Sequence, residues 1–515
     1  MRPRVLKLGT RRSALARAQS AAVGRQLEQL HPDLKVELVG IETRGDRIQD
    51  RPLSQVQGKE FFTAEIDTAL LDAAVDFTVH SYKDLSLERT HRLRLAAVPT
   101  REQPNDIAIF ARDVQERLAG GCELTIGTSS PRRMSFVPDL LKRLLPRPSS
   151  AAPAAGIRLV DLRGNVDSRL RRLHEPRGSA RQLDGIVLAF AGLARLWADE
   201  AGRALLAQLF APLPRMVLPL SACPGAPAQG ALGIECRAED AVTSEFLAAI
   251  DHAPSRRAVD AERALLAERG GGCHQRFGAT QIEIPALGAL LYLREEGGEA
   301  QLRWTPAAPL QKPDGAVRAW DGSRAERADI ERIESAEAAS LQRLGSAAAL
   351  FVAHTRALPQ GGAASIPTGA HVWVPGVSTW QALAERGVWV EGCGEGLGIA
   401  LLEPQLREPL LQLPPLPQWT VLTHAGAVNG WAPGQVIATY RHLEPVAGDA
   451  AAPPAGSSHL YWHSGAQFDR WGGKVDGSAQ HACGPGKTYQ HLLQAGVHNA
   501  RMFPSPVHWR SWLGL

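Results

Sequence analysis

Residues 4–41, RVLKLGTRRSALARAQSAAVGRQLEQLHPDLKVELVGI, predict the fold class on their own. Val5–Gly9 is predicted to be a strand, and Ala14–Leu30 follows as a helix with its apolar residues on roughly one face. Leu34–Ile41 then alternates between apolar and polar residues, as a second strand does. Layered strands and helices of this kind are typical of α/β proteins.

The same alternation of short apolar runs with helical patterns continues to about residue 240. This pattern favours open sheets with helices on both faces. Residues 101–105 (REQPN) and the Pro-, Ala- and Gly-rich residues 211–229 are predicted to be crossings between two such lobes. Two lobes joined by two crossings form a cleft, which is a favoured place for a ligand.

Two further units are predicted downstream. A helical pattern from Ala258 to Arg269 leads into GGGC and then into alternating strands around Gly288–Trp304, which indicates a small α+β domain. Strand candidates resume after about residue 345 in another α/β region. The predicted division is lobe 1 at residues 1–100 and 218–237, lobe 2 at 101–217, the α+β domain at 238–335 and a C-terminal module at 345–515.

Bulk composition excludes several classes of protein. The formal net charge of +4 at pH 7 is too small to imply nucleic acid, and 44% hydrophobic residues argue against disorder. The sequence shows neither a secretory signal nor a run of about 18 apolar residues, so we expect no membrane span. The six cysteines form no CxxC pair, so neither zinc nor disulfides are expected. We therefore expect a cytoplasmic monomer without a metal.

Arginine is unusually frequent: 8 of the 57 Lys and Arg residues are Lys, which leaves 49 Arg. Genome composition explains the count, and a single Arg is usually a solvated surface residue. However, Arg recurs with Ser and Thr where predicted strands lead into helices, and such turns bind anions. Several of these turns around one cleft favour a polyanionic ligand. The residues are Arg11, Ser13, Thr128, Ser129, Ser130, Arg132, Arg133, Arg163, Arg169 and Arg195.

Two short segments carry reactive groups. HSYKD, residues 80–84, places Lys83 and Asp84 after a predicted buried strand. An Asp in a cationic cleft can stabilise a developing cation and transfer protons; the alternative is a capping Asp beside a salt-bridged Lys. In GGGC, the three glycines leave Cys273 accessible to a bulky group, although a buried Cys is usually inert. Cys122, Cys236, Cys393 and Cys483 are expected to be inert, and Cys223 stays undecided.

Nine collinear segments resemble the hydroxymethylbilane synthase (porphobilinogen deaminase) family over about residues 4–305. The segments are KLGTRRSALA (7–16), ETRGDRI (42–48), GKEFFTAEID (58–67), VHSYKDL (79–85), IGTSSPRR (126–133), DLRGNVDSRL (161–170), GIVLAFAGLARL (185–196), QGALGIECR (229–237) and AERALLAERGGGC (261–273). The sequence departs from the family at Glu60–Phe61, at Leu85–Ser86 and in the expanded LSACPGAPAQG hinge. None of these changes removes a chemical group.

This resemblance implies two lobes like those of type II periplasmic binding proteins and a third, small domain. It implies a transferase of heme biosynthesis that joins four porphobilinogen molecules head to tail and releases ammonia each time. The chain would grow on a dipyrromethane cofactor linked by a thioether to Cys273. Asp84 would assist ammonia loss, stabilise the azafulvene-like cation and move protons. The cofactor would also contact Lys83, Thr128, Ser129, Ser130, Arg132 and Arg133, and the substrate would contact Arg11, Ser13, Arg163, Arg169 and Arg195.

Parts of residues 345–515 resemble uroporphyrinogen III synthase. The similar segments are HVWVPGVSTWQALAERGVWV (371–390), ATYRHLEP (438–445), HLYWHSGAQFDRW (459–471) and ACGPGKTYQHLLQAGV (482–497). The resemblance implies a lyase that cyclises hydroxymethylbilane, so the chain would be bifunctional. The candidate residues are Tyr440, Ser378, Thr379, Ser464 and Thr488, each of which could instead serve a turn or a helix cap. The first strand–helix unit of that family is not recognisable.

Three hypotheses follow. The chain is a deaminase fused to an active cyclising module, or a deaminase with a degenerate structural module. The third, from another class, is a non-catalytic anion-binding protein with the same two lobes. Asp84 and Cys273 discriminate, because a binding protein needs neither residue.

Overall fold

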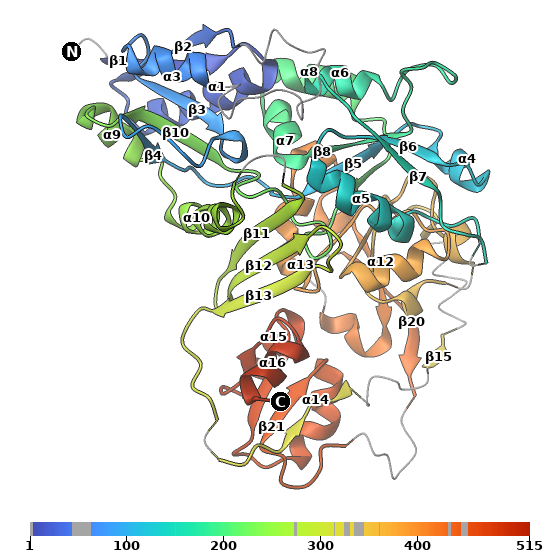
Figure 1. Cartoon of the computed structure of the whole chain (residues 1–515). Helices are drawn as coiled ribbons and strands as arrows, with labels where there is room; N and C mark the ends of the chain where they lie inside the picture. The colour runs from blue at the N-terminus through green and yellow to red at the C-terminus, as the bar shows by residue number, and fades with distance from the viewer. Residues whose placement is uncertain are drawn as a thin grey trace.

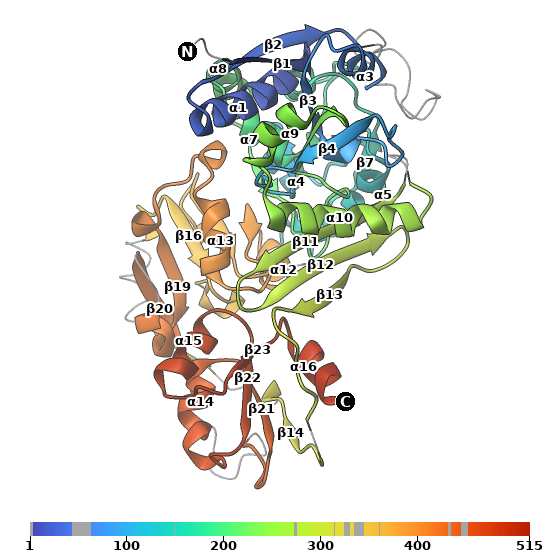
Figure 2. The same ribbon diagram turned by 90° about the vertical axis from the view of Figure 1, so that its left-hand side faces the viewer.

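The computed structural model describes residues 4–43, 63–149, 151–271, 275–313, 315–323, 330–333, 344–359, 361–430, 434–443 and 452–515. These residues form two lobes, a small α+β domain and a C-terminal module (Figures 1 and 2). Residues 46–60, together with Glu60 and Phe61, lie outside the described residues, and so does Cys273. In the described part, no helix is both long and apolar enough to cross a membrane.

Lobe 1 contains a sheet with the strand order β2-β1-β3-β10-β4. β1 runs parallel to β2 and β3, whereas β10 returns from far downstream and is antiparallel to β3 and β4. Leu8 and Phe77 of the sheet are fully buried in one core with Val23 and Leu27 of α1. The elements are β1 (Arg4–Arg11), α1 (Ala14–Leu30), β2 (Leu34–Ile41), α3 (Ala64–Leu71), β3 (Phe77–Ser81), β4 (Leu93–Ala97), β10 (Leu232–Arg237) and α9 (Ala241–Ala248).

Lobe 2 repeats this plan with the strand order β7-β6-β8-β5-β9. β6 is parallel to β7 and β8, and β5 is antiparallel to β8 and β9. Pro131 stands in the first turn of α5, where its missing N–H costs nothing. The elements are β5 (Asp106–Phe110), α4 (Val114–Ala119), β6 (Leu124–Gly127), α5 (Pro131–Leu144), β7 (Ile157–Val160), α6 (Val166–Arg171), β8 (Gly185–Ala189), α7 (Phe190–Ala198), α8 (Glu200–Leu209) and β9 (Arg215–Val217).

The α+β domain packs helix α10 against a three-stranded antiparallel sheet. Its elements are α10 (Ala253–Glu268), β11 (Phe277–Ile284), β12 (Gly288–Glu295) and β13 (Gln301–Pro306). The predicted boundary at residue 238 is wrong, because Leu247 of α9 and Ile250 belong to the core of lobe 1.

The C-terminal module has two sheets, β15-β20-β19-β16-β17-β18 and β14-β21-β22-β23. The predicted boundaries at 335 and 345 are also wrong: β14 and β15 pair with β21 and β20, so the module includes them. Its strands are β14 (Ala319–Trp320), β15 (Ile330–Arg332), β16 (Ala349–Val352), β17 (His371–Val374), β18 (Gly392–Cys393), β19 (Thr420–His424), β20 (Gln435–His442), β21 (His459–Trp462), β22 (Gln480–Cys483) and β23 (Arg501–Met502). Its helices are α12 (Val377–Ala384), α13 (Ile399–Leu406), α14 (Gly465–Trp471), α15 (Lys487–Gln494) and α16 (Pro506–Leu513).

The module and lobe 2 share their cores. The backbone N–H of Val217 in β9 donates to the carbonyl of Glu391, next to β18, at 2.7 Å, so an edge of one sheet meets an edge of the other. Helix α12 lies beside α5 (Figure 1), and the indole of Trp380 donates to the carbonyl of Leu144 at 3.1 Å. Buried side chains of both units therefore form continuous apolar clusters.

Candidate active site

The HSYKD segment lies where β3 ends. The strand residues are buried, and Tyr82–Asp84 form a single 3-10 turn that leaves Asp84 exposed. Burial lowers the pKa of Lys83, and the neighbouring Asp84 carboxylate opposes this shift. Arg133, Asp106 and Arg132 of lobe 2 also act on Lys83, so the turn faces the second lobe. Lys83 and Asp84 thus lie at the junction of the lobes.

Arg132 and Arg133, in the first turn of α5, converge on one buried carboxylate. Asp106 accepts a hydrogen bond from Arg132 Nη2 at 2.6 Å and another from Arg133 Nη2 at 2.7 Å. Gln229 of the return crossing adds a third at 2.8 Å. The two guanidinium groups hold the pKa of Asp106 below its usual range against the effect of burial. Both arginines are therefore fixed in position before any ligand arrives.

Two further arginines lie at helix α6: Arg163 precedes the helix and Arg169 is in its last turn. Arg169 Nε donates to the carbonyl of Gly164 at 2.7 Å. Burial, together with the charge of Arg133, lowers the pKa of Arg169 to about 10, and Asp84 is among the groups that oppose the shift. In Arg163, the Nε and Nη2 atoms are buried and have no hydrogen-bond partner among the described residues. This end of lobe 2 is consequently rich in positive charge and short of acceptors.

The other predicted residues lie at strand and helix ends. Ser13 caps α1 by accepting from the backbone N–H of Ala16 at 3.3 Å. Arg11, at the end of β1, is close enough to His80 to lower the pKa of that imidazole, although burial is the main cause. Arg195 donates to the carbonyl of Gly230 at 2.5 Å, and burial lowers its pKa to about 10. Arg195 thus touches the return crossing.

Thr128, Ser129 and Ser130 form the turn that precedes α5. The buried Thr128 hydroxyl accepts from the backbone N–H of Ser130 at 3.3 Å, which shapes the turn. Ser129 and Ser130 are half-buried. The turn therefore presents hydroxyl groups beside the two arginines that start the helix.

Gly271, the last described residue before Cys273, lies close to the segment that follows the HSYKD turn. A Cβ atom on Gly271 would come within 2.9 Å of Leu87 Cδ1, so these two residues are in contact. Arg263 of α10 donates to the carbonyls of Tyr82 and Leu85 at 3.1 and 3.0 Å. Helix α10 is therefore fastened to the segment that carries Asp84.

Sequence reasoning did not identify Asp106 or Gln229. It also did not identify a buried network of charged residues around Arg89. Arg89 bonds to Asp67 at 2.8 Å and to Glu235 at 2.5 Å, and His80 lies 3.4 Å from Glu235. Asp67, His80 and Glu235 are close enough to share a metal ion. The Arg89 guanidinium, however, already supplies a positive charge to both carboxylates. The one signal in the sequence was the occurrence of charged residues within apolar strand patterns.

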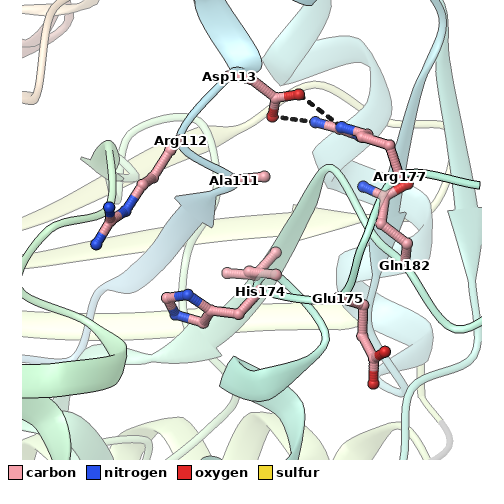
Figure 3. Close-up of a pocket in the computed structure, with 8 residues that line it drawn as sticks. Ala111, Arg112, Asp113, His174, Glu175, Arg177 and Gln182 are labelled. Carbon is pink, nitrogen blue, oxygen red and sulfur yellow. Dashed lines mark hydrogen bonds and ion pairs between the residues drawn. The ribbon is translucent and has the colours of Figure 1, made fainter. Parts of the chain in front are cut away.

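Two hollows lie outside this cluster of arginines. One, of about 410 Å³, is on lobe 2, where Arg177 bonds to Asp113 and the Arg112 and His174 side chains lie nearby (Figure 3). It contains no predicted site residue. The other, of about 420 Å³, lies between α10 and the HSYKD turn and is lined by Tyr82 and Arg263 among others.

In the C-terminal module, imidazoles gather at the carboxyl ends of parallel strands. His424 ends β19, His442 ends β20 and His354 follows β16. The His424 and His442 rings are 4.9 Å apart, and the largely buried Tyr440 ring is 5.8 Å from His424. Burial, then His442, His354 and Lys487 of α15, lower the pKa of His424 to about 4. Helix α15, which begins at Lys487 and follows β22 of the module's other sheet, therefore lies close to this cluster.

The remaining predicted residues of the module are more dispersed. Ser464 caps α14 through its side chain, and the Thr488 hydroxyl donates to the carbonyl of His463 at 3.4 Å. Thr379 is 9% exposed in α12, whereas Ser378 is exposed beside it. Of these residues, Thr488 is the sequence neighbour of Lys487, whose charge acts on His424 of the imidazole cluster.

Residues 6–245 match the family model described as porphobilinogen deaminase, dipyromethane cofactor binding domain. The porphobilinogen deaminase of Syntrophotalea carbinolica is 39% identical over 314 residues, covering 60% of this chain and 89% of that protein. The porphobilinogen deaminase of Sorangium cellulosum is 35% identical over 346 residues, covering 67% and 97%. The methionine-binding protein MetQ, a solved structure, covers 52% of this chain and 96% of its own at 11% identity, but its TM-score of 0.26 supports no argument.

The level of identity and the share of these relatives that is covered decide the assignment. The matched region contains the HSYKD turn and every predicted arginine of the two lobes. The cofactor of the matched domain is dipyrromethane. This chain belongs to the porphobilinogen deaminase family.

Proposed function

We propose that this protein is a hydroxymethylbilane synthase, which condenses four porphobilinogen molecules head to tail and releases one ammonia at each step. The observation that carries the proposal is that Lys83 and Asp84 of lobe 1 meet the arginines of lobe 2. Each porphobilinogen brings two carboxylates, so the growing chain is a polyanion that needs several guanidinium groups. Family membership supports the same activity.

The arginines of lobe 2 fit a ligand that carries carboxylates. The partnerless nitrogens of Arg163 lack an acceptor, and the depressed pKa of Arg169 shows that its charge is poorly compensated. A ligand carboxylate would accept hydrogen bonds from Arg163 and would compensate the charge of Arg169. When bound, the cofactor supplies the primer on which the chain grows. We propose that it is attached at Cys273 and contacts Lys83, Thr128, Ser129, Ser130, Arg132 and Arg133, and that Arg11, Ser13, Arg163, Arg169 and Arg195 bind substrate.

Asp84 has the chemistry that ammonia loss requires. When the carbon–nitrogen bond breaks, the departing amine takes up a proton and positive charge develops on the substrate. A carboxylate can transfer that proton, and in its ionised form it stabilises the cation.

We also propose that both lobes are of the type II periplasmic-binding-protein kind. In lobe 1 the parallel strands lie in the order β2-β1-β3, and in lobe 2 the corresponding order is β7-β6-β8. In each lobe, the next strand is antiparallel and enters the sheet from a crossing: β10 in lobe 1 and β5 in lobe 2. Such a design supports ligand binding between the lobes. It is equally compatible with a non-catalytic binding protein, so the lobes alone do not decide function.

Two measurements separate the enzyme from the binding protein. Intact mass spectrometry of the purified chain is expected to show an adduct with the mass of one dipyrromethane, and incubation with porphobilinogen is expected to release ammonia. A chain that carries no adduct and binds porphobilinogen without turnover would support the binding protein.

For the C-terminal module, we propose uroporphyrinogen III synthase activity. The supporting observation is the cluster of His354, His424, His442 and Tyr440 at the carboxyl ends of parallel strands, where open α/β sheets bind ligands. Lys487, at the start of helix α15, lies close enough to this cluster for its charge to act on His424. Tethering two enzymes raises the effective concentration of the second site for the product of the first.

The product isomer tests this second activity. The full chain is incubated with porphobilinogen alone, the product is oxidised, and isomers I and III are separated. Isomer III is expected. Isomer I alone would mean that the module is structural and that the chain is a monofunctional deaminase.

A further inference from the structure

Glu395, in the loop after β18 of the C-terminal module, holds the return crossing between the lobes. Its two carboxylate oxygens accept from the backbone N–H groups of Leu220 at 2.5 Å and Ser221 at 3.1 Å. Its backbone has φ = 55°, which is unusual for a residue with a side chain. Burial raises the pKa of Glu395, and the hydrogen bonds from Ser221 and Leu220 oppose the shift.

The same crossing holds the arginines of lobe 2. Arg132 Nη1 donates to the carbonyl of Pro224 at 2.7 Å, only three residues beyond Ser221. Further along, Gln229 donates to Asp106 at 2.8 Å, and Asp106 is the carboxylate shared by Arg132 and Arg133. The position of the crossing therefore decides where both guanidinium groups lie.

The α+β domain holds the middle of this crossing. The backbone N–H of Gly225 donates to the Thr280 hydroxyl at 2.8 Å, and Arg294 donates to the carbonyl of Ala222 at 2.7 Å. Glu395 fixes Leu220 and Ser221 nearer the upstream end, just beyond Leu218, which is itself bonded to Asn105 and Asp106. The crossing is thus held between the module on one side and the α+β domain on the other.

We propose that Glu395 is a positioning residue for the deaminase reaction: through the crossing, the C-terminal module sets the position of Arg132 and Arg133. This inference rests on the proposed deaminase function. It assigns the C-terminal module a role in the deaminase reaction, whether or not the module catalyses a reaction itself. Displacements of about 1 Å in a binding group cost up to about 100-fold in rate, so loss of the contact is measurable.

The test compares Glu395→Gln with Glu403→Gln in the full chain. Glu403 lies on nearby α13 in an exposed ion pair with Arg407, so its substitution controls for loss of a carboxylate in the module. Glu395→Gln is expected to raise the KM for porphobilinogen roughly 10-fold or more, as for a misplaced binding group, with the chain still folded at the assay temperature. Hydrogen exchange is expected to rise in residues 219–229. Glu403→Gln is expected to change neither quantity.

A second variant covers the case in which Glu395→Gln does not fold. Ser221→Ala removes the hydroxyl that also hydrogen-bonds Glu395, which is a smaller perturbation, and is expected to move KM and exchange in the same direction. A folded Glu395→Gln chain, or Ser221→Ala chain, with wild-type KM and kcat would overturn the inference and leave the contact purely structural. Failure of the proposed function is distinguishable, because the unsubstituted chain would then show neither adduct nor turnover.

Discussion

The guanidinium of Arg101 lies 2.6 Å from a carboxylate oxygen of Glu262, and this ion pair joins the first crossing between the lobes to helix α10. The second Glu262 oxygen accepts from the backbone N–H of Ala228, in the return crossing, at 2.7 Å. The Glu262 side chain is fully buried. A single carboxylate therefore ties both crossings to the α+β domain.

Glu262→Ala is expected to lower the free energy of unfolding by about 3–5 kcal/mol, because it leaves the Arg101 charge buried without its partner. Urea denaturation followed by circular dichroism measures the change. Glu268→Ala, at the exposed end of the same helix, is the matched control, with an expected change within about 0.5 kcal/mol. Equal stability of the two variants would contradict this account of the hinge.

Asp84→Asn is expected to reduce turnover by about 100-fold or more, as for loss of a general acid–base group. The fold is expected to persist, since Asp84 is exposed. Ammonia release under saturating porphobilinogen measures the effect, and Asp139→Asn, an exposed substitution on α5, serves as the control. Undiminished turnover in Asp84→Asn would assign the carboxylate to helix capping alone.

Cys273→Ser is expected to abolish the covalent adduct and, with it, turnover. Cys122→Ser, which changes a half-buried thiol of lobe 2, is expected to keep both. Intact mass spectrometry reads the outcome directly. An adduct retained in the Cys273 variant would move the attachment point to another cysteine.

Arg163→Gln is expected to raise KM roughly 10- to 100-fold, since a hydrogen bond to a charged group contributes about 1.5–3 kcal/mol. The comparison is Arg158→Gln, because Arg158 is exposed in the neighbouring strand β7 and pairs with Glu123. Initial-rate kinetics over a range of porphobilinogen concentrations separate KM from kcat. Equal KM values for the two variants would exclude Arg163 from carboxylate binding.

Acid is expected to destabilise the C-terminal module through His424, whose pKa is lowered from 6.5 to about 4. The folded state therefore binds fewer protons than the unfolded state between these values. Stability is full above about pH 6.5 and falls as the pH drops toward 4. His424→Asn is expected to flatten the dependence of the urea midpoint on pH in this window, whereas His491→Asn, on exposed α15, is not. Parallel slopes in all three proteins would count against the cluster.

Hydrophobic periodicity was enough to predict the first strands and the first helix of lobe 1, where apolar residues recur with the period of the element. The predicted helix at Ala14–Leu30 and strand at Leu34–Ile41 agree with α1 and β2. Periodicity could not find β14 or β15, which span two and three residues. Their pairing with β21 and β20 depends on distant sequence, and so the module boundary was misplaced.

The position of a candidate residue was predictable where it depends on a local turn, as for Asp84 or Ser13. It was not predictable where one group orients another across the fold. Asp106 belongs to an apolar strand pattern, DIAIF, and only the packed lobes bring Arg132, Arg133 and Gln229 to it. Likewise, Glu395 and Leu220 are remote in sequence, so their contact has no sequence signature.

The hydrogen bond between Val217 and Glu391 also bears on how the protein is made. Lobe 2 is complete in sequence once β9 has left the ribosome, but the segment that covers its edge is translated much later. An uncovered strand edge is a template for pairing with other chains. The nascent polypeptide therefore carries an uncovered edge while the residues between β9 and Glu391 are being synthesised, and a premature stop in that region would release a fragment with this edge uncovered.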